Sequence, residues 1–251
     1  MSEETKNRSN IVVVSIFTDE KLADQMRESA EKTKEDLTVG YTQLDNRGNR
    51  LYHSAAEGYN DTLEHPLESE VIVFCHQDII FLPGALQTIY RLCSENKSTL
   101  FGAAGVRNAR KEGESRIISS MAIIQEGWNY KSLKKGETQD VFTLDECLIA
   151  GSRELFEELR FDEEVCDGWH LYAAELCMQC HVKGYPVKVF DANIVHLSGG
   201  NQDKTFYQCE RKLVKKYRNR FPLISYTCGW AYTDPVRYGL LSLYRKMRYH
   251  I

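Results

Sequence analysis

The stretch Val71-Ile72-Val73-Phe74-Cys75-His76-Gln77-Asp78 decides the fold. Its first five residues are apolar and mostly β-branched or aromatic, which is typical of a strand buried on both faces of a sheet. The polar run His76-Gln77-Asp78 follows where this strand ends. An aspartate in that position can hold a divalent cation between the protein and a phosphate group. Taken alone, however, the run favours a simple turn acid at Asp78 over a metal ligand.

Two earlier segments extend this pattern toward the N-terminus. Ile11–Phe17 is a second continuous apolar run, and Leu37–Leu44 alternates before it ends in the turn composition of Asp45–Asn49. With a helix after each of these strands, the βαβαβ opening predicts an α/β fold with a largely parallel sheet and helices on both faces. Ligands bind such sheets beyond the carboxyl ends of the strands. Asp45–Asn49 and His76–Asp78 are both expected at that edge.

Periodicity and capping residues predict the remaining elements. The expected helices are a segment that Thr18 and Asp19 can cap and that runs to Lys32, then His53–Glu64, Gly84–Asn96, Arg153–Leu159, His170–Lys183 and Lys204–Asn219. Further strands are expected at Thr99–Val106, Arg116–Ile124 and Pro186–Phe190. We expect one domain over residues 1–225 and a basic, aromatic tail or helix over residues 226–251.

The charge of the chain is divided unevenly along its length. The 251 residues have a formal net charge of −4, which excludes a basic nucleic-acid footprint for the whole molecule. From Arg211 onward there are ten Lys and Arg and one acid, Asp234, so this segment is +9 and residues 1–210 are −13. An acidic body with a basic end suggests contact with an anionic surface.

The N-terminal sequence and the cysteines suggest a cytoplasmic protein. The start, MSEETKNRSN, has no apolar signal core, and no apolar run reaches the length of a membrane span. The eight cysteines are scattered through apolar patterns and are expected to be reduced. We therefore expect a cytoplasmic location, with peripheral contact on the inner face of the membrane as a further expectation.

A series of short motifs resembles the family 2 glycosyltransferases, in particular a branch whose strand-end signature is His-Gln-Asp in place of Asp-x-Asp. The order and spacing of these motifs across residues 11–200 carry the resemblance, and no single one is specific. They are Ile11–Phe17, Leu44-Asp45-Asn46, Ala55–Asn60, Phe74–Asp78, Thr143–Leu148, Phe161-Asp162-Glu163, Trp169–Tyr172, Gly184-Tyr185 and His196–Gly200. The resemblance implies the GT-A fold, a nucleotide-binding α/β sandwich.

The resemblance also implies roles for single residues. Asp45 would bond the base of the donor, expected to be uridine, and Asn60 would support the nucleotide pocket. Asp78 would bind Mn²⁺ or Mg²⁺, with His196 as a second metal ligand. A neutral imidazole is a competent ligand for Mn²⁺ and a less natural one for Mg²⁺. His76 and Gln77 are expected to line the donor site beside Asp78.

One departure from the family pattern concerns the catalytic base. Related enzymes carry Glu-Asp where this chain has Tyr172-Ala173. Asp167 is our first candidate for the base and His170 the second, because a histidine titrates near neutral pH. Asp167 could equally be a helix cap. Trp169 is expected in the core, with a platform for the sugar ring as the alternative.

These observations predict an inverting, metal-assisted glycosyltransferase of the hexosyltransferase type. It would move a sugar from a nucleotide-diphosphate donor to a hydroxyl of a glycan or a lipid-linked acceptor. Two alternatives stay open, namely a sugar-nucleotide-binding protein without turnover and a nucleotidyltransferase. The absence of the Glu-Asp pair favours the first, and the acidic segment after the first strand disfavours the second.

The tail is expected to contact either lipid or protein. Its expected apolar stripe consists of Tyr238, Leu241, Leu243, Tyr244 and Met247, with Arg245, Lys246 and Arg248 beside it. A basic amphipathic helix of this kind can lie on anionic lipid. It can equally pack on the body or on a second subunit, as in a homodimer.

Overall fold

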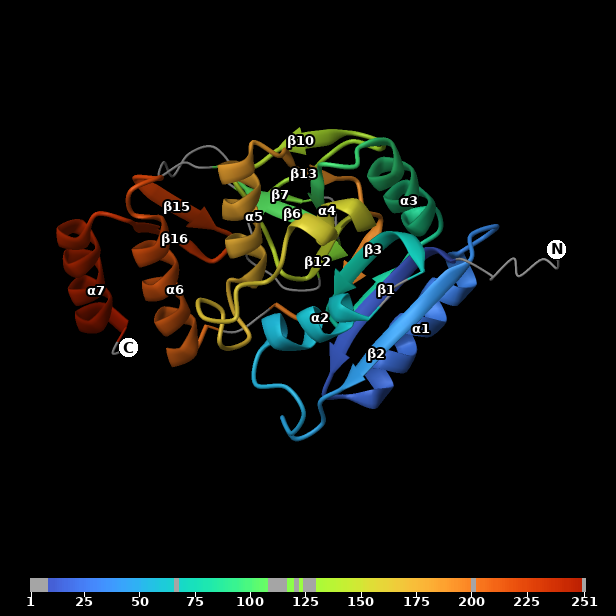
Figure 1. Ribbon diagram of the computed structural model, residues 1–251, viewed down its shortest axis with the longest axis horizontal. Coiled ribbons are helices and arrows are strands. Elements are labelled where there is room, and N and C mark those ends of the chain that lie inside the picture. Colours follow the sequence, from blue (N-terminus) through green and yellow to red (C-terminus); the bar gives the residue numbers. More distant parts are fainter. Residues whose placement is uncertain are drawn as a thin grey trace.

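The centre of the molecule is a seven-stranded sheet with the order β10-β13-β5-β12-β3-β1-β2 (Figure 1). The computed structural model describes residues 9–65, 68–107, 117–119, 122–123, 130–199 and 202–249. The strands of this sheet are β1 (Ser9–Phe17), β2 (Val39–Asp45), β3 (Ser69–Cys75), β5 (Leu100–Gly102), β10 (Thr138–Asp140), β12 (Leu148–Ser152) and β13 (Val187–Phe190).

The prediction of a largely parallel sheet is confirmed. β1 pairs in parallel with both β2 and β3, and β5 pairs in parallel with β13. Only β12 and β10 run against the other strands. The strand β12 was not predicted, although it lies between β3 and β5 and all of its residues are buried. Its sequence Leu-Ile-Ala-Gly-Ser is short and contains three residues of low β-propensity.

Helices cover both faces of the sheet, as predicted. In β1, Ile11 and Val13 belong to a core shared with α1 and α3. Val12 and Val14 belong to a second core shared with α2, α4, α5 and α6. All four valine and isoleucine side chains are at most 5% exposed, which explains why the strand is apolar throughout rather than alternating. The helices are α1 (Glu20–Thr33), α2 (Ala55–Glu64), α3 (Ala85–Glu95), α4 (Arg153–Glu158), α5 (Tyr172–Lys183), α6 (Lys204–Tyr217) and α7 (Pro235–Tyr249).

Smaller sheets border the central one. The expected strand Thr99–Val106 is divided into β5 and β6 (Ala104–Val106). The expected strand Arg116–Ile124 is described only at β7 (Ile117–Ser119) and β8 (Ala122–Ile123), and its other residues lie outside the described ranges. The remaining strands are β4 (Ile79–Phe81), β9 (Tyr130–Lys131), β11 (Thr143–Leu144), β14 (Ile194–His196), β15 (Leu223–Tyr226) and β16 (Gly229–Tyr232).

At two helices, single residues determine where the helix begins. Asp19 caps α1 by accepting hydrogen bonds from the backbone amides of Lys21 and Leu22, as the sequence predicts. The helix expected from His170 begins instead at Tyr172. The reason is that Leu171 has a φ of 61°, a left-handed conformation that interrupts the helix.

The C-terminal segment is a hairpin of β15 and β16 followed by α7, which lies at one edge of the molecule (Figure 1). The expected stripe was wrong in part. Tyr238 and Arg245 face the body, where both bond Glu210 of α6. Leu243, Tyr244 and Met247, also in the expected stripe, are exposed. Among the described residues, no helix combines the length and the apolar character needed to cross a membrane.

Candidate active site

Three potential metal ligands meet where β3 ends. The Nε2 atom of His196 lies 3.4 Å from Oδ1 of Asp78 and 3.4 Å from Nδ1 of His76. The Nδ1 atom of His76 lies 4.0 Å from Oδ1 of Asp78. All three ligand atoms fall within 4.8 Å of one another, so one ion could contact the whole group.

Strand pairing brings these residues together from distant parts of the chain. β14 runs antiparallel to β4, with His196 opposite Ile79, the residue after Asp78. The backbone amide of Leu197 donates to the carbonyl oxygen of Asp78 at 3.1 Å. On the other side, the amide of His76 donates to the carbonyl of Cys147, just before β12, at 3.0 Å. The backbone on both sides of the group is therefore fixed.

The charge state of the group suits metal binding. Burial lowers the pKa of His76, and the neighbouring His196 lowers it further, so its imidazole stays neutral and keeps a lone pair for a ligand. Burial alone would raise the pKa of Asp78, but hydrogen bonds from His196 and Ser198 outweigh it and hold that pKa well below its usual range. Asp78 is therefore ionised at neutral pH. One carboxylate and two imidazoles fit Mn²⁺ better than Mg²⁺, which prefers oxygen ligands.

A cleft of about 440 Å³ opens beside the three ligands. His76 and Asp78 line it, together with two aromatic residues of the α5 region, Trp169 and Tyr172. The other lining residues come from the β1 end, the loop before α2, α2 itself and the residues near the strand ends: Ile16, Thr18, Asn49, Ala55, Tyr59, Gln77 and Ser198. The cleft thus lies at the carboxyl edge of the sheet, where the sequence predicts the ligand.

Gln77 fixes the loop after β1. Its side-chain oxygen accepts hydrogen bonds from the backbone amides of Thr18 and Asp19, both at 2.8 Å. Its amide nitrogen donates to the hydroxyl of Thr18 at 3.3 Å. Gln77 therefore lines the cleft and also joins the ends of β1 and β3.

Asp45 and Asn60 lie outside the set of cleft-lining residues. Asp45 ends β2 and forms a bidentate pair with Arg47, with nitrogen–oxygen distances of 2.5 and 2.9 Å. Hydrogen bonds from Arg47 lower the pKa of Asp45. Asn60 uses both ends of its side chain on the backbone of Phe161, and it also donates to Glu163 at 2.7 Å. Asn60 therefore holds the loop after α4 against α2.

Neither sequence candidate for the base is among the cleft-lining residues. The carboxylate of Asp167 is 58% exposed and pairs with Lys212 at 2.5 Å. His170 lies 3.3 Å from the carboxylate of Asp203, which caps α6. Trp169, between them, does line the cleft.

Two further residues of interest were not singled out from the sequence. The hydroxyl of Tyr172 contacts Nε2 of His76 at 3.2 Å and donates to the carbonyl oxygen of Glu146 at 3.2 Å. Burial and the adjacent Asp145 raise the pKa of the partly buried Glu146 carboxyl to about 8. The backbone amide of Leu171 bonds this carboxyl and opposes the rise. A carboxyl with a pKa raised this far, in a residue whose backbone bonds a cleft-lining tyrosine, is a candidate proton acceptor.

Glu175, which lies one helical turn after Tyr172-Ala173, is not among the cleft-lining residues. Glu175 is fully buried, and it bonds Lys216 at 2.5 Å and Tyr217 at 2.8 Å, both on α6. Gln179 donates to its other oxygen at 2.6 Å. Glu175 therefore joins α5 to α6.

Solved structures with the same fold are glycosyltransferases of the GT-A type. A structure of GalNAc-T7 with UDP, GalNAc and Mn²⁺ superposes with a TM-score of 0.57 at 12% identity, over 83% of this chain and 48% of that one. A structure of residues 1–349 of TarS from S. aureus superposes with a TM-score of 0.51 at 15% identity, over 84% of this chain and 66% of that one. The chain thus spans about half the length of the first and slightly less than two thirds of the second.

Sequence comparisons agree with the fold. A product of Fuscovulum blasticum described as "ATP synthase subunits region ORF 6" is 21% identical over 220 residues, which are 84% of each chain. The model of a family described as glycosyltransferase-like matches residues 12–221, most of the chain. The chain belongs to this glycosyltransferase-like family.

Proposed function

We propose that the protein transfers a sugar from a uridine-diphosphate donor to a hydroxyl group of a glycan or of a lipid-linked acceptor. The observation that carries this proposal is the group of Asp78, His76 and His196 at the wall of the 440 Å³ cleft. An anionic oxygen and two imidazoles at the carboxyl edge of the sheet suit a divalent cation together with a diphosphate. The GalNAc-T7 structure, with UDP, GalNAc and Mn²⁺ in its description, supports the same choice of donor and metal.

The three ligands would hold the cation, and each would contribute in a different way. Asp78 supplies the negative charge, His196 is buried against it, and His76 is oriented by the hydroxyl of Tyr172. When bound, a divalent cation supplies charge neutralisation for the departing nucleoside diphosphate. Supporting hydrogen bonds of this kind typically fix the ring orientation of a ligating histidine.

Residues that line the cleft, and others outside its lining, would bind and orient the two substrates. Trp169 offers an aromatic face to the sugar ring, and Gln77 keeps the β1 loop in place beside it. Asp45 would accept a hydrogen bond from the donor base at the end of β2, and Arg47, its present partner, would have to share it. Asn60 supports the pocket from behind by holding the loop after α4.

Transfer requires that a base remove the acceptor hydroxyl proton while this oxygen attacks the anomeric carbon. Attack opposite to the leaving diphosphate inverts that carbon. We propose Glu146 for this base, because its pKa of about 8 suits a proton acceptor and its backbone carbonyl oxygen accepts a hydrogen bond from the cleft-lining Tyr172. Asp167 and His170 remain the alternatives from sequence position, and the structure pairs Asp167 with Lys212 and places His170 3.3 Å from the carboxylate of Asp203.

Thermal unfolding in the presence of nucleotides tests the donor and metal assignments. We expect UDP with Mn²⁺ to raise the midpoint by roughly 5–10 °C at a hundredfold excess over the dissociation constant, because ligands that bind only the native state stabilise it. Asp78→Asn should abolish the dependence on Mn²⁺. Asp140→Asn, an exposed aspartate on β10, is the matched control and should behave as the wild type. A full Mn²⁺-dependent shift in Asp78→Asn would refute the site.

A second candidate is a sugar-nucleotide-binding protein without turnover. The replacement of the family's Glu-Asp by Tyr172-Ala173 favours it, together with the structural role of Glu175. Slow hydrolysis of the donor by water separates the two functions. Release of UDP from UDP-sugar by the wild type, and its loss in Asp78→Asn, would exclude the pure binder.

A further inference from the structure

Helix α7 presents an unusual apolar stripe to solvent. Five large side chains are more than half exposed: Val236 (71%), Leu240 (64%), Leu243 (54%), Tyr244 (53%) and Met247 (67%). Apart from the adjacent pair Leu243 and Tyr244, they follow one another at intervals of three and four residues, so they lie along one face of the helix. A contiguous apolar surface of this kind marks an interaction site more often than scattered exposed residues do.

The contacts of α7 with the body hold this stripe outward. On the opposite face of the helix, Arg245 donates to both carboxylate oxygens of the fully buried Glu210 at 2.9 and 2.6 Å. Tyr238 donates to the same carboxylate at 3.2 Å, and a second nitrogen of Arg245 donates to the carbonyl of Trp230 at 2.7 Å. The helix is therefore fixed in rotation by α6 and β16.

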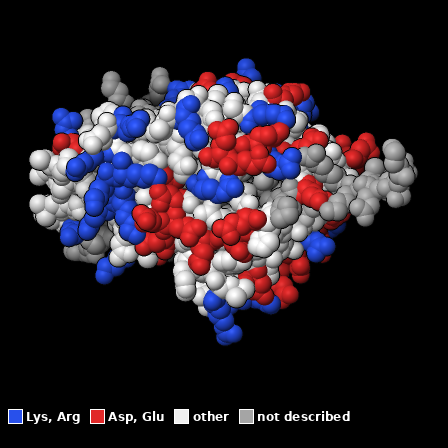
Figure 2. Space-filling view, in the orientation of Figure 1, with Lys and Arg blue, Asp and Glu red and all other residues white. Residues whose placement is uncertain are grey.

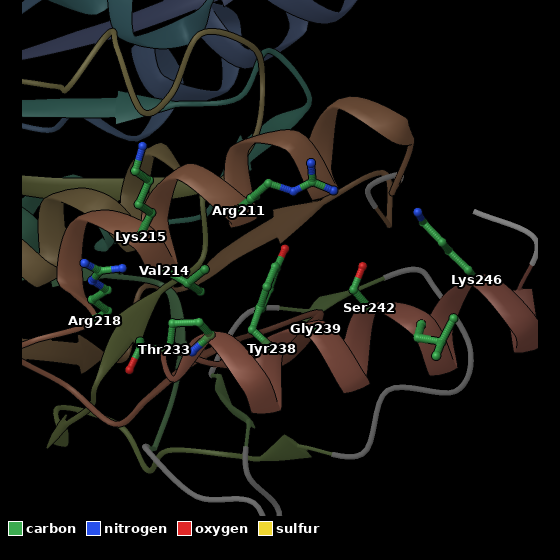
Figure 3. A pocket seen from close by; sticks show the side chains of 11 residues that line it. Arg211, Val214, Lys215, Arg218, Thr233, Tyr238, Gly239, Ser242 and Lys246 are labelled. Carbon is green, nitrogen blue, oxygen red and sulfur yellow. The ribbon is translucent and has the colours of Figure 1, made fainter.

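Cations flank the stripe on both sides. A groove of about 500 Å³ separates α6 from α7, and its charged lining consists of Arg211, Lys215, Arg218 and Lys246. Figure 3 shows Tyr238, Ser242 and Lys246 extending from α7 on the side of this groove. Leu243 belongs to both the groove and the stripe. Arg237 lies on the other flank, over the ring of Tyr232.

These groove cations are available for an external anion. Within the described ranges, no ion pair joins Arg211, Lys215, Arg218 or Lys246 to a carboxylate, whereas Lys212 and Lys216 are paired with acids of the body. Figure 2 shows the same division as a basic area over α6 that borders an acidic area of the body, with the uncharged surface of α7 at the edge. On the face shown, the acidic area disfavours approach of an anionic surface to the body beside α6, whereas the basic area over α6 favours it.

We propose that α7 and the α6–α7 groove together dock on an anionic lipid bilayer, with the apolar stripe in the interface and the groove cations on lipid phosphates. A protein partner would need an apolar face with acidic residues on both flanks. An anionic bilayer offers an apolar interior and negatively charged phosphates at every point of its surface. This contact goes beyond sugar transfer and does not depend on catalysis. It would bring the protein to lipid-linked acceptors.

Flotation of the full chain with vesicles tests the contact. The vesicles are phosphatidylcholine with or without phosphatidylglycerol. We expect flotation with the anionic vesicles only. Lys215→Gln/Lys246→Gln should lower the partition coefficient roughly 30-fold, which corresponds to about 1 kcal/mol for each cation. Leu240→Ser/Met247→Ser should lower it at least roughly tenfold, because less apolar area enters the interface.

Matched variants separate this surface from general charge and apolar effects. Lys21→Gln/Lys32→Gln removes two exposed lysines of α1, and Leu51→Ser removes an exposed leucine of another loop, and both should float as the wild type does. Unfolding midpoints of all variants report whether each one folds. Equal flotation on neutral vesicles, or loss of flotation in the α1 variant, would overturn the proposal.

Two other ligands of this surface, a second copy of the chain and a soluble anion, would give different results. Either result would overturn the proposal of lipid docking. A wild-type dimer that Leu240→Ser/Met247→Ser converts to monomer, without vesicle binding, would assign the stripe to a second copy. Thermal stabilisation by inorganic phosphate that Lys215→Gln/Lys246→Gln abolishes, again without vesicle binding, would assign the groove to a soluble anion.

Discussion

Asp78, His76 and His196 combine one ionised carboxylate with two imidazoles in a partly buried corner. The carboxylate keeps its charge because both histidines and Ser198 interact with it. His76 keeps its lone pair because burial and the second imidazole both disfavour a proton on it. At the scale of single residues, this corner is thus prepared for a cation before one binds.

Glu146 is the residue on which we base a test of proton transfer. Glu146→Gln should lower kcat by roughly 10²–10⁴-fold with little change in KM, since general base catalysis contributes about that factor. A base works only when deprotonated, so the wild-type rate should rise with pH up to the pKa of about 8 and level off above it. Measured pH profiles of kcat in the wild type and in Glu146→Gln check both statements.

Asp167→Asn and His170→Gln are the controls for this test. The carboxylate of Asp167 already pairs with Lys212, and His170 with Asp203, so we expect either variant to keep most of the activity. A large loss of kcat in Asp167→Asn, with Glu146→Gln fully active, would restore the base assignment that sequence position favours.

The sequence could point to the members of the candidate metal site, although it predicted His76 only as a residue that lines the donor site. Asp78 follows directly from the end of a buried strand, and His196 from its order among the family motifs. His76 and His196 are 120 residues apart, however, and only the pairing of β14 with β4 shows that they touch. Tyr172 and Glu146 were missed for the same reason, because a contact across 26 residues leaves no periodic signal.

At the scale of helices and strands, continuous apolar runs and turn residues were sufficient for most of the sheet. β1 and β3 lie within two residues of their predicted bounds, since their β-branched residues are buried on both faces. β2, at the edge of the sheet and only partly buried, was predicted from its alternating pattern and the turn residues that follow it. β12 could not be predicted, because Ala150, Gly151 and Ser152 have low β-propensity and form a strand only between two neighbours. The added side chain of any larger residue at Gly151 would meet Leu155 at 2.7 Å.

The attachment of α7 depends on one buried ion pair. Arg245→Met should destabilise the protein by about 3 kcal/mol, because the fully buried Glu210 loses its cation. Burial already raises the pKa of Glu210, and Arg245 opposes this rise. Without Arg245 the pKa of Glu210 rises further, so at acidic pH the Glu210 carboxyl takes up a proton and no buried charge is left unpaired. The free energy of unfolding should therefore fall more at pH 8 than at pH 5. Urea unfolding at both pH values checks the direction.

Two further variants serve as controls for the effect of Arg245→Met on stability. Glu210→Gln/Arg245→Met removes the buried charge while keeping an acceptor for Tyr226 and Tyr238, and we expect it to recover most of the lost stability. Arg237→Met, on the exposed flank of α7, should change stability by less than about 1 kcal/mol. Equal destabilisation in Arg237→Met and Arg245→Met would show that Glu210 does not anchor the helix.

On the scale of the whole molecule, charge and function divide between two regions. The cleft is built from the strand ends, α2 and the start of α5, and all of its lining residues lie within residues 1–210, which have a net charge of −13. The groove is built from α6 and α7, and no lining residue is common to both. Sites without shared residues usually act additively.

We therefore expect the nucleotide and lipid functions to be separable by mutation. Asp78→Asn should lose Mn²⁺-dependent stabilisation by UDP and keep the wild-type partition onto anionic vesicles. Leu240→Ser/Met247→Ser should show the reverse, and a chain with all three substitutions should show the sum of the two losses. Thermal unfolding and flotation on the same preparations measure both functions. If Asp78→Asn altered vesicle partition, the two regions would be coupled, and α6, which bonds both α7 and Glu175 of α5, would be the element that connects them.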